Sequence, residues 1–131
     1  MAEQTLDFWP DVATAPRRVT ALSLMKQQAV LLGKHTKNLL EGEVSSSVHD
    51  GRLVHRFRIS VPTLDYSYEL FRISHDIVAF YPVRVESSMV GPLAGHPLLD
   101  SEEAFMGWLK NVLSSDETKR VLDSLLAQVE S

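Results

Sequence analysis

Hydrophobic residues recur every three or four positions over residues 17–41, which predicts an amphipathic helix. Leucines, alanines and a methionine fall on one side of this segment, and its lysines fall on the other. Gly42 follows the last periodic position and is a typical place for a helix to end. Gly33 lies inside the segment, where it lowers helix stability, so we expect a close packing contact there.

After Gly42 the period changes from about 3.6 to 2, which indicates strands. Residues 43–49 predict a short strand, and Asp50-Gly51 is a strong hairpin signal. Residues 52–61 alternate between apolar and polar side chains, as expected for a strand with one buried face. The first two strands are therefore predicted to form a hairpin.

Two more strands are predicted after a turn at residues 62–64. The third covers residues 65–74, and its alternation breaks at Leu70-Phe71, which indicates a bulge. The fourth covers residues 77–86 and contains Pro82, which cannot donate to a strand ladder and so indicates an edge position.

Residues 87–99 are expected to form a loop, after which the helical period returns. Asp100 or Ser101 is predicted to cap one helix, and Ser114 is predicted to cap a second. The order is thus one helix, four strands and two helices.

This order predicts an α+β fold, because consecutive antiparallel strands joined by short turns form a meander. The N-terminal helix and the two C-terminal helices should pack on one face of the four-stranded sheet. The length of 131 residues fits a single domain. We expect an N-terminal arm at residues 1–15 and one α+β domain at residues 16–131.

Composition excludes several kinds of site. With 44% hydrophobic and 23% charged residues, the chain is typical of a folded domain. It has no cysteine, which excludes disulfides, thiolate metal sites and thiol catalysis, and favours a reducing compartment. The sequence shows no signal peptide and no apolar stretch long enough to cross a bilayer, so we expect a cytoplasmic protein without a membrane partner.

Charge is unevenly distributed along the chain. Residues 17–40 carry five basic residues and no acid, whereas residues 100–131 carry seven acids and three basic residues. Helices from the two ends could be neighbours of opposite charge, or they could present two different surfaces to two partners. Both interpretations stay open.

Two histidine–aspartate pairs fall in predicted turns, at His49-Asp50 and His75-Asp76. In a meander the first and third turns lie at the same end of the sheet. Imidazole and carboxylate groups are ligands for zinc and other divalent metals, so the four residues form a candidate metal site. The alternative is that all four serve only the turns, because aspartate favours turns for local backbone reasons.

A second candidate site is a pocket between the sheet and the helices. Histidine and aromatic side chains on the strands and the first C-terminal helix could line it: His55, Tyr66, Tyr68, Tyr81 and Trp108. His55 lies on the predicted core face, where a hydrogen-bonded structural role is the alternative.

A third candidate site is a partner-binding surface. Phe8 and Trp9 are the apolar anchor of the predicted arm, and they would pack on the domain or on a partner. Arg56, Arg58 and Arg84 lie on the polar face of the sheet. Such residues with nearby tyrosines could also contact nucleic acid, although acids interleave with them.

No nucleophile elbow or phosphate-binding loop occurs in the chain. We therefore expect a non-catalytic protein-binding module, such as an inhibitor, an immunity-type protein, a chaperone or an accessory subunit. The first alternative is a small-molecule-binding or hydrolytic domain with a pocket between sheet and helices. The second is nucleic-acid binding by the sheet face, which we do not favour. No cofactor is expected, a protein partner is expected, and a homodimer is left open.

Overall fold

The structure, a computed structural model, describes residues 5–13, 19–86 and 97–130. Its described part contains three α-helices, one short 3₁₀ helix and five strands. In chain order they are α1 (Ala21–His35), β1 (Glu41–His49), β2 (Arg52–Val61), η1 (Pro62–Leu64), β3 (Tyr66–Asp76), β4 (Val83–Glu86), β5 (Leu98–Leu99), α2 (Glu102–Leu113) and α3 (Asp116–Val129). The predicted α+β class and the order of helices and strands are confirmed.

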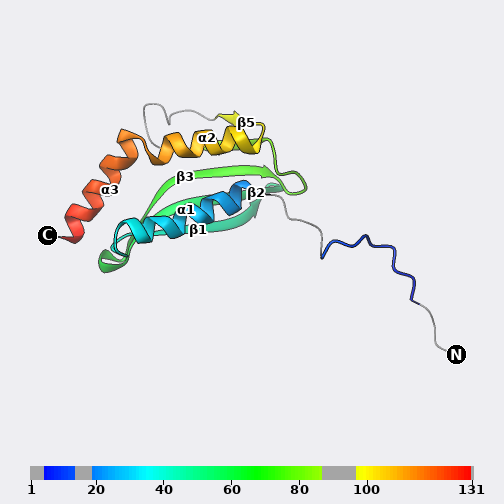
Figure 1. The fold of residues 1–131 in the computed structure, drawn as a ribbon, viewed down its shortest axis with the longest axis horizontal. Coiled ribbons are helices and arrows are strands. Elements are labelled where there is room, and N and C mark those ends of the chain that lie inside the picture. Colours follow the sequence, from blue (N-terminus) through cyan, green and yellow to red (C-terminus); the bar gives the residue numbers. More distant parts are fainter. Residues whose placement is uncertain (1–4, 14–18, 87–96, 131) are drawn as a thin grey trace.

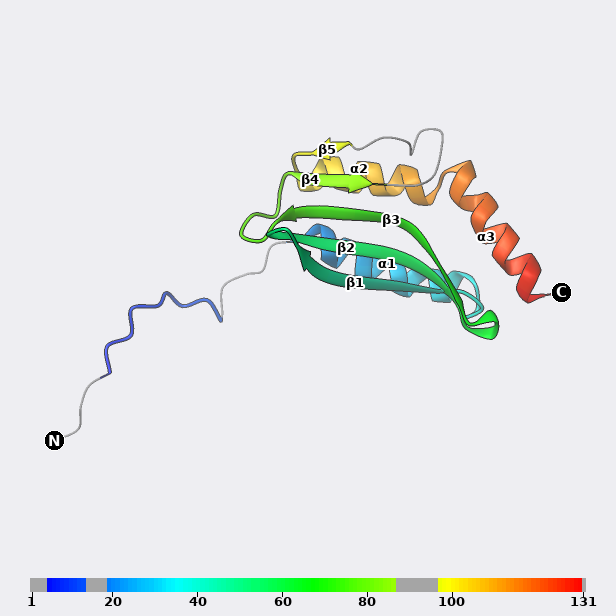
Figure 2. The same cartoon turned by 180° about the vertical axis from the view of Figure 1, so that it is seen from behind.

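The strands form one antiparallel sheet in the order β1-β2-β3-β4-β5, as a meander requires. α1 and α2 lie on the same face of this sheet and run in the same direction, and α3 turns away from the end of α2 (Figure 1). Figure 2 shows the opposite face without a helix over it. The predicted helix layer on one sheet face is therefore present.

α1 is shorter than the segment of residues 17–41 that the hydrophobic period predicted. It begins after Thr20, whose hydroxyl accepts from Ser23 N while the Ser23 hydroxyl accepts from Thr20 N, so the two residues satisfy each other's backbone donors. It ends at His35, because Lys37 and Asn38 have φ values of 51° and 63° and leave the helix.

Gly42 belongs to β1 and does not end the helix as expected. A Cβ atom at Gly42 would lie 2.4 Å from Ala29 Cα and 2.8 Å from Ala29 O. The glycine therefore allows α1 to pack directly on the backbone of β1. Gly33 also has a close neighbour, as the sequence predicted, because a Cβ atom there would lie 3.2 Å from Asn38 Oδ1.

The bulge predicted at Leu70-Phe71 is confirmed. Phe57 pairs with Phe71, but the next residue, Arg58, pairs with Glu69, so Leu70 is the extra residue on β3. The bulge turns both Leu70 and Phe71 into the interior, where each is 1% exposed.

The sheet has five strands, and the prediction of four was wrong. β5 lies within the segment expected to be a loop, and it pairs with Val83 and Arg84 of β4. A strand of two residues is too short to show alternation.

β4 itself covers only the last part of residues 77–86, and it is not the edge strand that Pro82 suggested. Pro82 precedes the strand after a cis peptide bond with Tyr81, so it needs no ladder hydrogen bond.

The core lies between the helices and the inner face of the sheet. Its largest fully buried side chains come from every layer: Met25, Leu40, Phe57, Ile59, Leu70, Phe71, Ile73 and Phe105. Phe57 and Phe71 stack with ring centroids 5.4 Å apart, and Trp108 of α2 contacts Phe71 edge-on at 4.9 Å. None of the helices in the described part is long and apolar enough to cross a membrane.

Candidate functional site

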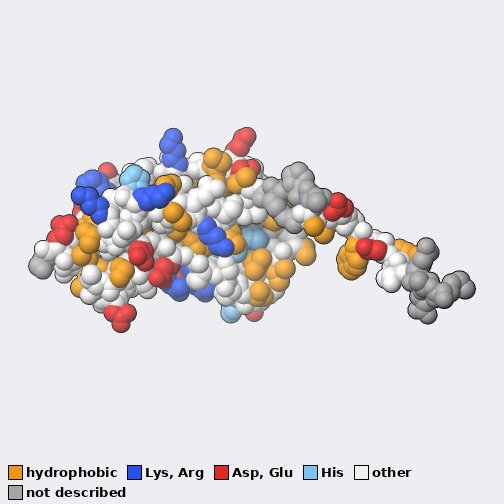
Figure 3. Space-filling model, turned by 60° about the horizontal axis from the view of Figure 1, so that its bottom comes forward, with side chains coloured by type: hydrophobic (Ala, Val, Ile, Leu, Met, Phe, Trp, Pro, Cys, Tyr) orange, Lys and Arg blue, Asp and Glu red, His pale blue; other side chains and the backbone are white. Residues whose placement is uncertain are grey.

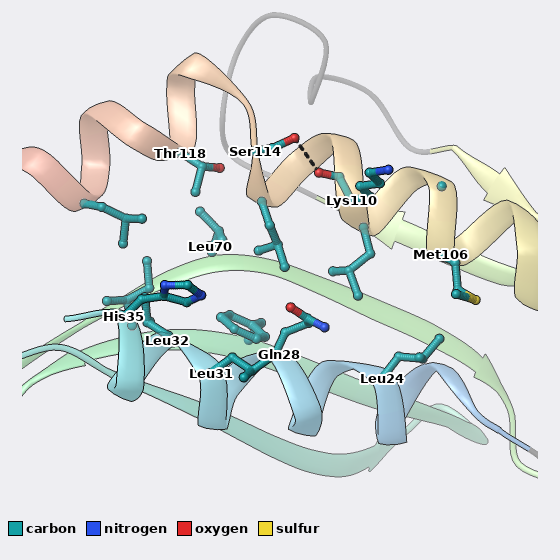
Figure 4. A pocket seen from close by; sticks show the side chains of 16 residues that line it. Leu24, Gln28, Leu31, Leu32, His35, Leu70, Met106, Lys110, Ser114 and Thr118 are labelled. Carbon is teal, nitrogen blue, oxygen red and sulfur yellow. Dashed lines mark hydrogen bonds between the residues drawn. The ribbon is translucent and has the colours of Figure 1, made fainter. Parts of the chain in front are cut away.

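An open apolar groove lies between the helices on the inner face of the sheet (Figure 4). α1 forms one wall, α2 and the start of α3 form the other, and β2 and β3 form the floor. Its volume is about 600 Å³. The side chains that line it are mainly aliphatic and include Leu24, Leu31, Leu32, Met106, Leu109, Leu113 and Leu122, with Phe57, Ile59 and Leu70 beneath them.

The walls follow from helical periodicity. On α1 the lining positions are 24, 28, 31, 32 and 35, which form one stripe of a 3.6-residue period. A neighbouring stripe of Ala21, Met25 and Ala29 is buried against the sheet. α1 therefore has apolar side chains on two adjacent stripes, one buried against the sheet and one that lines the groove.

Several groove residues are left exposed to solvent. Leu31 is 39% exposed and Met106 is 48% exposed. Gly107 of α2 also lines the groove and has no side chain. A Cβ atom there would have no neighbour within 4 Å, so the groove is open at this position. The groove is thus an apolar surface that the rest of the described chain does not fill.

The polar groups at the groove give its edge a positive bias. No carboxylate is among the lining residues that the structure describes, whereas Lys110 and His35 are. The hydroxyls of Ser114 and Thr118 donate to carbonyl oxygens of α2, to Lys110 O at 2.7 Å and Val112 O at 2.7 Å. A ligand would therefore meet an apolar surface with Lys110, His35 and Gln28 as its polar contacts.

His55 and His75 form a buried pair near the other end of the sheet. They are 2% and 8% exposed, and their Nε2 atoms lie 3.0 Å apart. The Nδ1 of His75 is close to two carbonyl oxygens, Asp76 O and Ala79 O, so it carries a hydrogen and donates. His55 Nε2 then donates to His75 Nε2, and the hydroxyl of Ser46 donates to His55 Nδ1 at 2.7 Å.

In this chain of hydrogen bonds every ring nitrogen of the pair has a partner. Burial, the neighbouring His75 and the ammonium of Lys26 lower the pKa of His55 from 6.5 to about 4. The chain of contacts Ser46–His55–His75 has the residue types of a catalytic triad, with a serine nucleophile, a histidine base and a group that orients the base. However, a base with so low a pKa is weak at neutral pH, and Ser46 lies on the exposed edge strand outside the groove. We assign the pair a structural role.

The four residues of the candidate metal site do not converge. His49 and Asp76 do lie at the same end of the sheet, because Arg52 pairs with both of them. Strand alternation, however, sends His75 to the core and Asp76 to the open face, where Arg52 Nη1 binds its carboxylate at 2.9 Å. His49 contacts its own neighbour Asp50 at 3.4 Å. The described residues contain no group of three potential metal ligands.

The open face of the sheet carries balanced charge. Cross-strand pairing places five arginines and five acids on it: Arg52, Arg56, Arg58, Arg72 and Arg84 with Glu41, Glu43, Glu69, Asp76 and Glu86. Glu69 binds Arg72 at 2.8 Å and Arg56 at 3.4 Å, and Arg58 donates to Ser45. Nucleic-acid binding requires an excess of positive charge, which this face does not provide.

The side chains predicted to line a pocket lie outside the groove. His55 is in the histidine pair, and Tyr66 is 50% exposed at the start of β3. Tyr68 and Trp108 pack against the core. Tyr81 has a buried hydroxyl without a hydrogen-bond partner in the described part of the chain, and burial and Glu102 raise its pKa.

The residues that do form the groove were seen in the sequence only as helix stripes. The available signal was the width of the apolar side of residues 17–41, where Leu24 and Leu31 widen the stripe beyond the core-facing positions. That excess predicts an additional apolar contact, but it does not say with what.

Phe8 and Trp9 do not pack on the described domain. They are 87% and 86% exposed, on a segment that leads away from the start of α1 (Figures 1 and 2). A hydrogen bond from Trp9 N to Asp7 Oδ1 at 3.0 Å holds a local turn in this segment.

The described residues thus include an open apolar groove with Lys110 and His35 at its edge, and an arm with exposed aromatic side chains. No protein-family model, curated protein or solved structure matches the chain.

Proposed function

We propose that the chain is a non-catalytic protein-binding module and that its groove holds an apolar segment of a partner protein. The observation that carries this proposal is the open space of about 600 Å³ between two helix stripes whose leucines face each other across it. Leaving such surface in water costs about 25 cal/mol for each Å². A partner segment that covers it would recover that free energy.

The length of the groove fits a protein segment. Its α1 wall runs from position 24 to position 35, which is about 16 Å at 1.5 Å per residue. This length accommodates about three turns of a helix or about five residues of an extended chain. Grooves between helices commonly bind partners through apolar anchors spaced along such a segment.

Electrostatics suggest the character of the segment. Lys110 and His35 lie at the edge, and the described lining contains no carboxylate. An apolar segment flanked by aspartate or glutamate would therefore be attracted, and one flanked by lysine or arginine would not.

A second candidate function is binding of a small molecule with an apolar tail and a carboxylate. The volume lies within the range of roughly 300–1,000 Å³ that small-molecule sites occupy, and Lys110 could pair with the carboxylate. The open, elongated shape between two helices favours the protein segment (Figure 4).

The test is a pull-down from the source organism's lysate with three tagged chains: wild type, Leu31→Glu and Val30→Glu. Both positions are exposed aliphatics on α1, at 39% and 63%, but only Leu31 lines the groove. Bound proteins and small molecules are identified by mass spectrometry.

We expect one protein that wild type and Val30→Glu retain and that Leu31→Glu loses. A small molecule with this same dependence, and no protein, would support the second candidate. Retention of every bound species by Leu31→Glu would overturn the groove as the site.

A further inference from the structure

We propose that the arm of a second copy of this chain lies in the groove, so that two copies exchange arms. The inference uses the groove of the proposed function and adds a specific occupant. It concerns residues 5–13, the described part of the arm, with Phe8 and Trp9 as anchors.

The first argument is that large apolar side chains in the described part of the arm are exposed. Leu6, Phe8 and Trp9 are 71%, 87% and 86% exposed. Phenylalanine and tryptophan each bury about 150–250 Å² at an interface, so two such rings in succession are a strong anchor. The arm and the groove are therefore two unfilled apolar surfaces on one chain.

The second argument is size. Fully extended, the five residues from Leu6 to Pro10 would span about 13 Å at roughly 3.3 Å per residue. The α1 wall is about 16 Å long. The arm needs no helix to fit, and Pro10 disfavours one.

The third argument is charge. The arm contains three acids and no lysine or arginine before Arg17. Figure 3 shows hydrophobic and acidic side chains along it and no basic ones. The groove edge has Lys110 and His35, and its described lining has no acid. The two surfaces are complementary in charge as well as in apolarity.

The exit direction of the chain favours a second copy over the arm's own domain. The groove follows α1 from Leu24 toward its C-terminal end, whereas the arm leads away from the N-terminal end (Figures 1 and 2). Thr20 is extended, with φ −104° and ψ 161°, and its capping box with Ser23 fixes this entry into the helix.

Reciprocal exchange forms a closed twofold dimer, in which each copy gives one arm and accepts one. Four aromatic rings would bury roughly 600–1,000 Å², and the groove surface that they cover would contribute a similar area. The resulting sum of roughly 1,200–2,000 Å² is in the range that specific protein–protein interfaces bury.

The test is disulfide cross-linking between two single-cysteine chains, which the absence of native cysteine makes possible. Asp7→Cys marks the arm of the full chain. Gln28→Cys marks the groove, and Gln27→Cys is its matched control, because Gln27 is exposed on the same helix outside the groove. One chain of each mixture carries a tag, so that a mixed dimer has its own mass on a non-reducing gel.

We expect the mixed dimer of Asp7→Cys with Gln28→Cys to form at least about tenfold faster than that with Gln27→Cys, because docking raises the local concentration of the two thiols. Addition of Phe8→Ser and Trp9→Ser should remove this preference. Equal rates for Gln28→Cys and Gln27→Cys would overturn the proposal. So would linkage within one chain carrying both Asp7→Cys and Gln28→Cys, with no mixed dimer, because the arm would then fill its own groove.

These outcomes are separate from the test of the proposed function. If cross-linking fails and Leu31→Glu still loses a captured protein, the groove binds a partner but the arm is not its occupant. If cross-linking succeeds and no protein is captured, the groove serves association between copies alone.

Discussion

At the scale of single residues, His55 gives the fold a pH dependence. Its ring is buried and its Nε2 atom lies 3.0 Å from Nε2 of the buried His75. The sequence placed His55 on the core face of its strand through alternation alone. It could not show that His75 is its partner, because the position of His75 depends on the register of β2 with β3 and on β3 extending past Ser74.

We predict that the free energy of unfolding falls as the pH is lowered from 6.5 toward 4. The pKa of His55 is about 4 in the fold and 6.5 ordinarily, so the unfolded chain binds the extra proton in this window. The contribution is fully present above pH 6.5 and is lost toward pH 4, and it amounts to roughly 3 kcal/mol. Urea denaturation at a series of pH values measures it.

The control variants separate His55 from other titrating groups. His55→Gln should flatten the slope between pH 6.5 and 4, whereas His49→Gln should leave it unchanged because His49 is 77% exposed. A slope that His55→Gln does not alter would contradict the assignment.

At the scale of helices and strands, regular alternation was enough to predict most of the fold. The Asp50-Gly51 dipeptide indicated the first hairpin, and the break in apolar/polar alternation at Leu70 indicated the bulge. The end of α1 and the existence of β5 were not predicted. α1 ends through a left-handed turn at Lys37 and Asn38, and β5 exists because β4 offers it an edge. The pairing that forms β5 is a tertiary contact and has no local signature in the sequence.

Substitution of Gly42, with Gly107 of α2 as the control, tests the packing of α1 on β1. Gly42→Ala should destabilise the chain by about 3 kcal/mol or more, because its Cβ would lie 2.4 Å from Ala29 Cα and neither backbone can yield cheaply. Gly107→Ala should stabilise it by about 0.5–1 kcal/mol, because alanine favours the helix and nothing lies within 4 Å. Thermal and urea unfolding of both variants provide the measurement, and a Gly42→Ala chain as stable as wild type would show that α1 does not approach β1 so closely.

At the scale of the whole molecule, the sequence predicted a layer of helices on a sheet and, as an alternative, a pocket between them, but with other lining residues than those of the groove. The groove arises because α1 and α2 present apolar stripes to each other across the sheet and α3 turns away from α2 (Figures 1 and 4). Each stripe alone has the pattern of a core-facing helix. Their separation is a property of the assembled layers.

If the groove serves binding, its walls should contribute little to stability. We predict that Leu31→Glu changes the free energy of unfolding by less than about 1 kcal/mol, since the side chain is already 39% exposed. Met25→Ala on the same helix should cost about 2–5 kcal/mol, since Met25 is 0% exposed and lies outside the groove. Urea denaturation compares the two, and a large loss for Leu31→Glu would mean that the groove wall is part of the core.

The most direct measurement of groove binding is an NMR spectrum of the chain labelled with ¹³C at its four methionine methyl groups. Met106 lines the groove and is 48% exposed, whereas Met25 of α1 is fully buried in the core. Saturation with the protein captured in the pull-down should shift the Met106 signal, identified by Met106→Leu, and leave that of Met25 nearly in place. A complex that forms by sedimentation while the Met106 signal stays unchanged would contradict the proposal that the groove is the binding site.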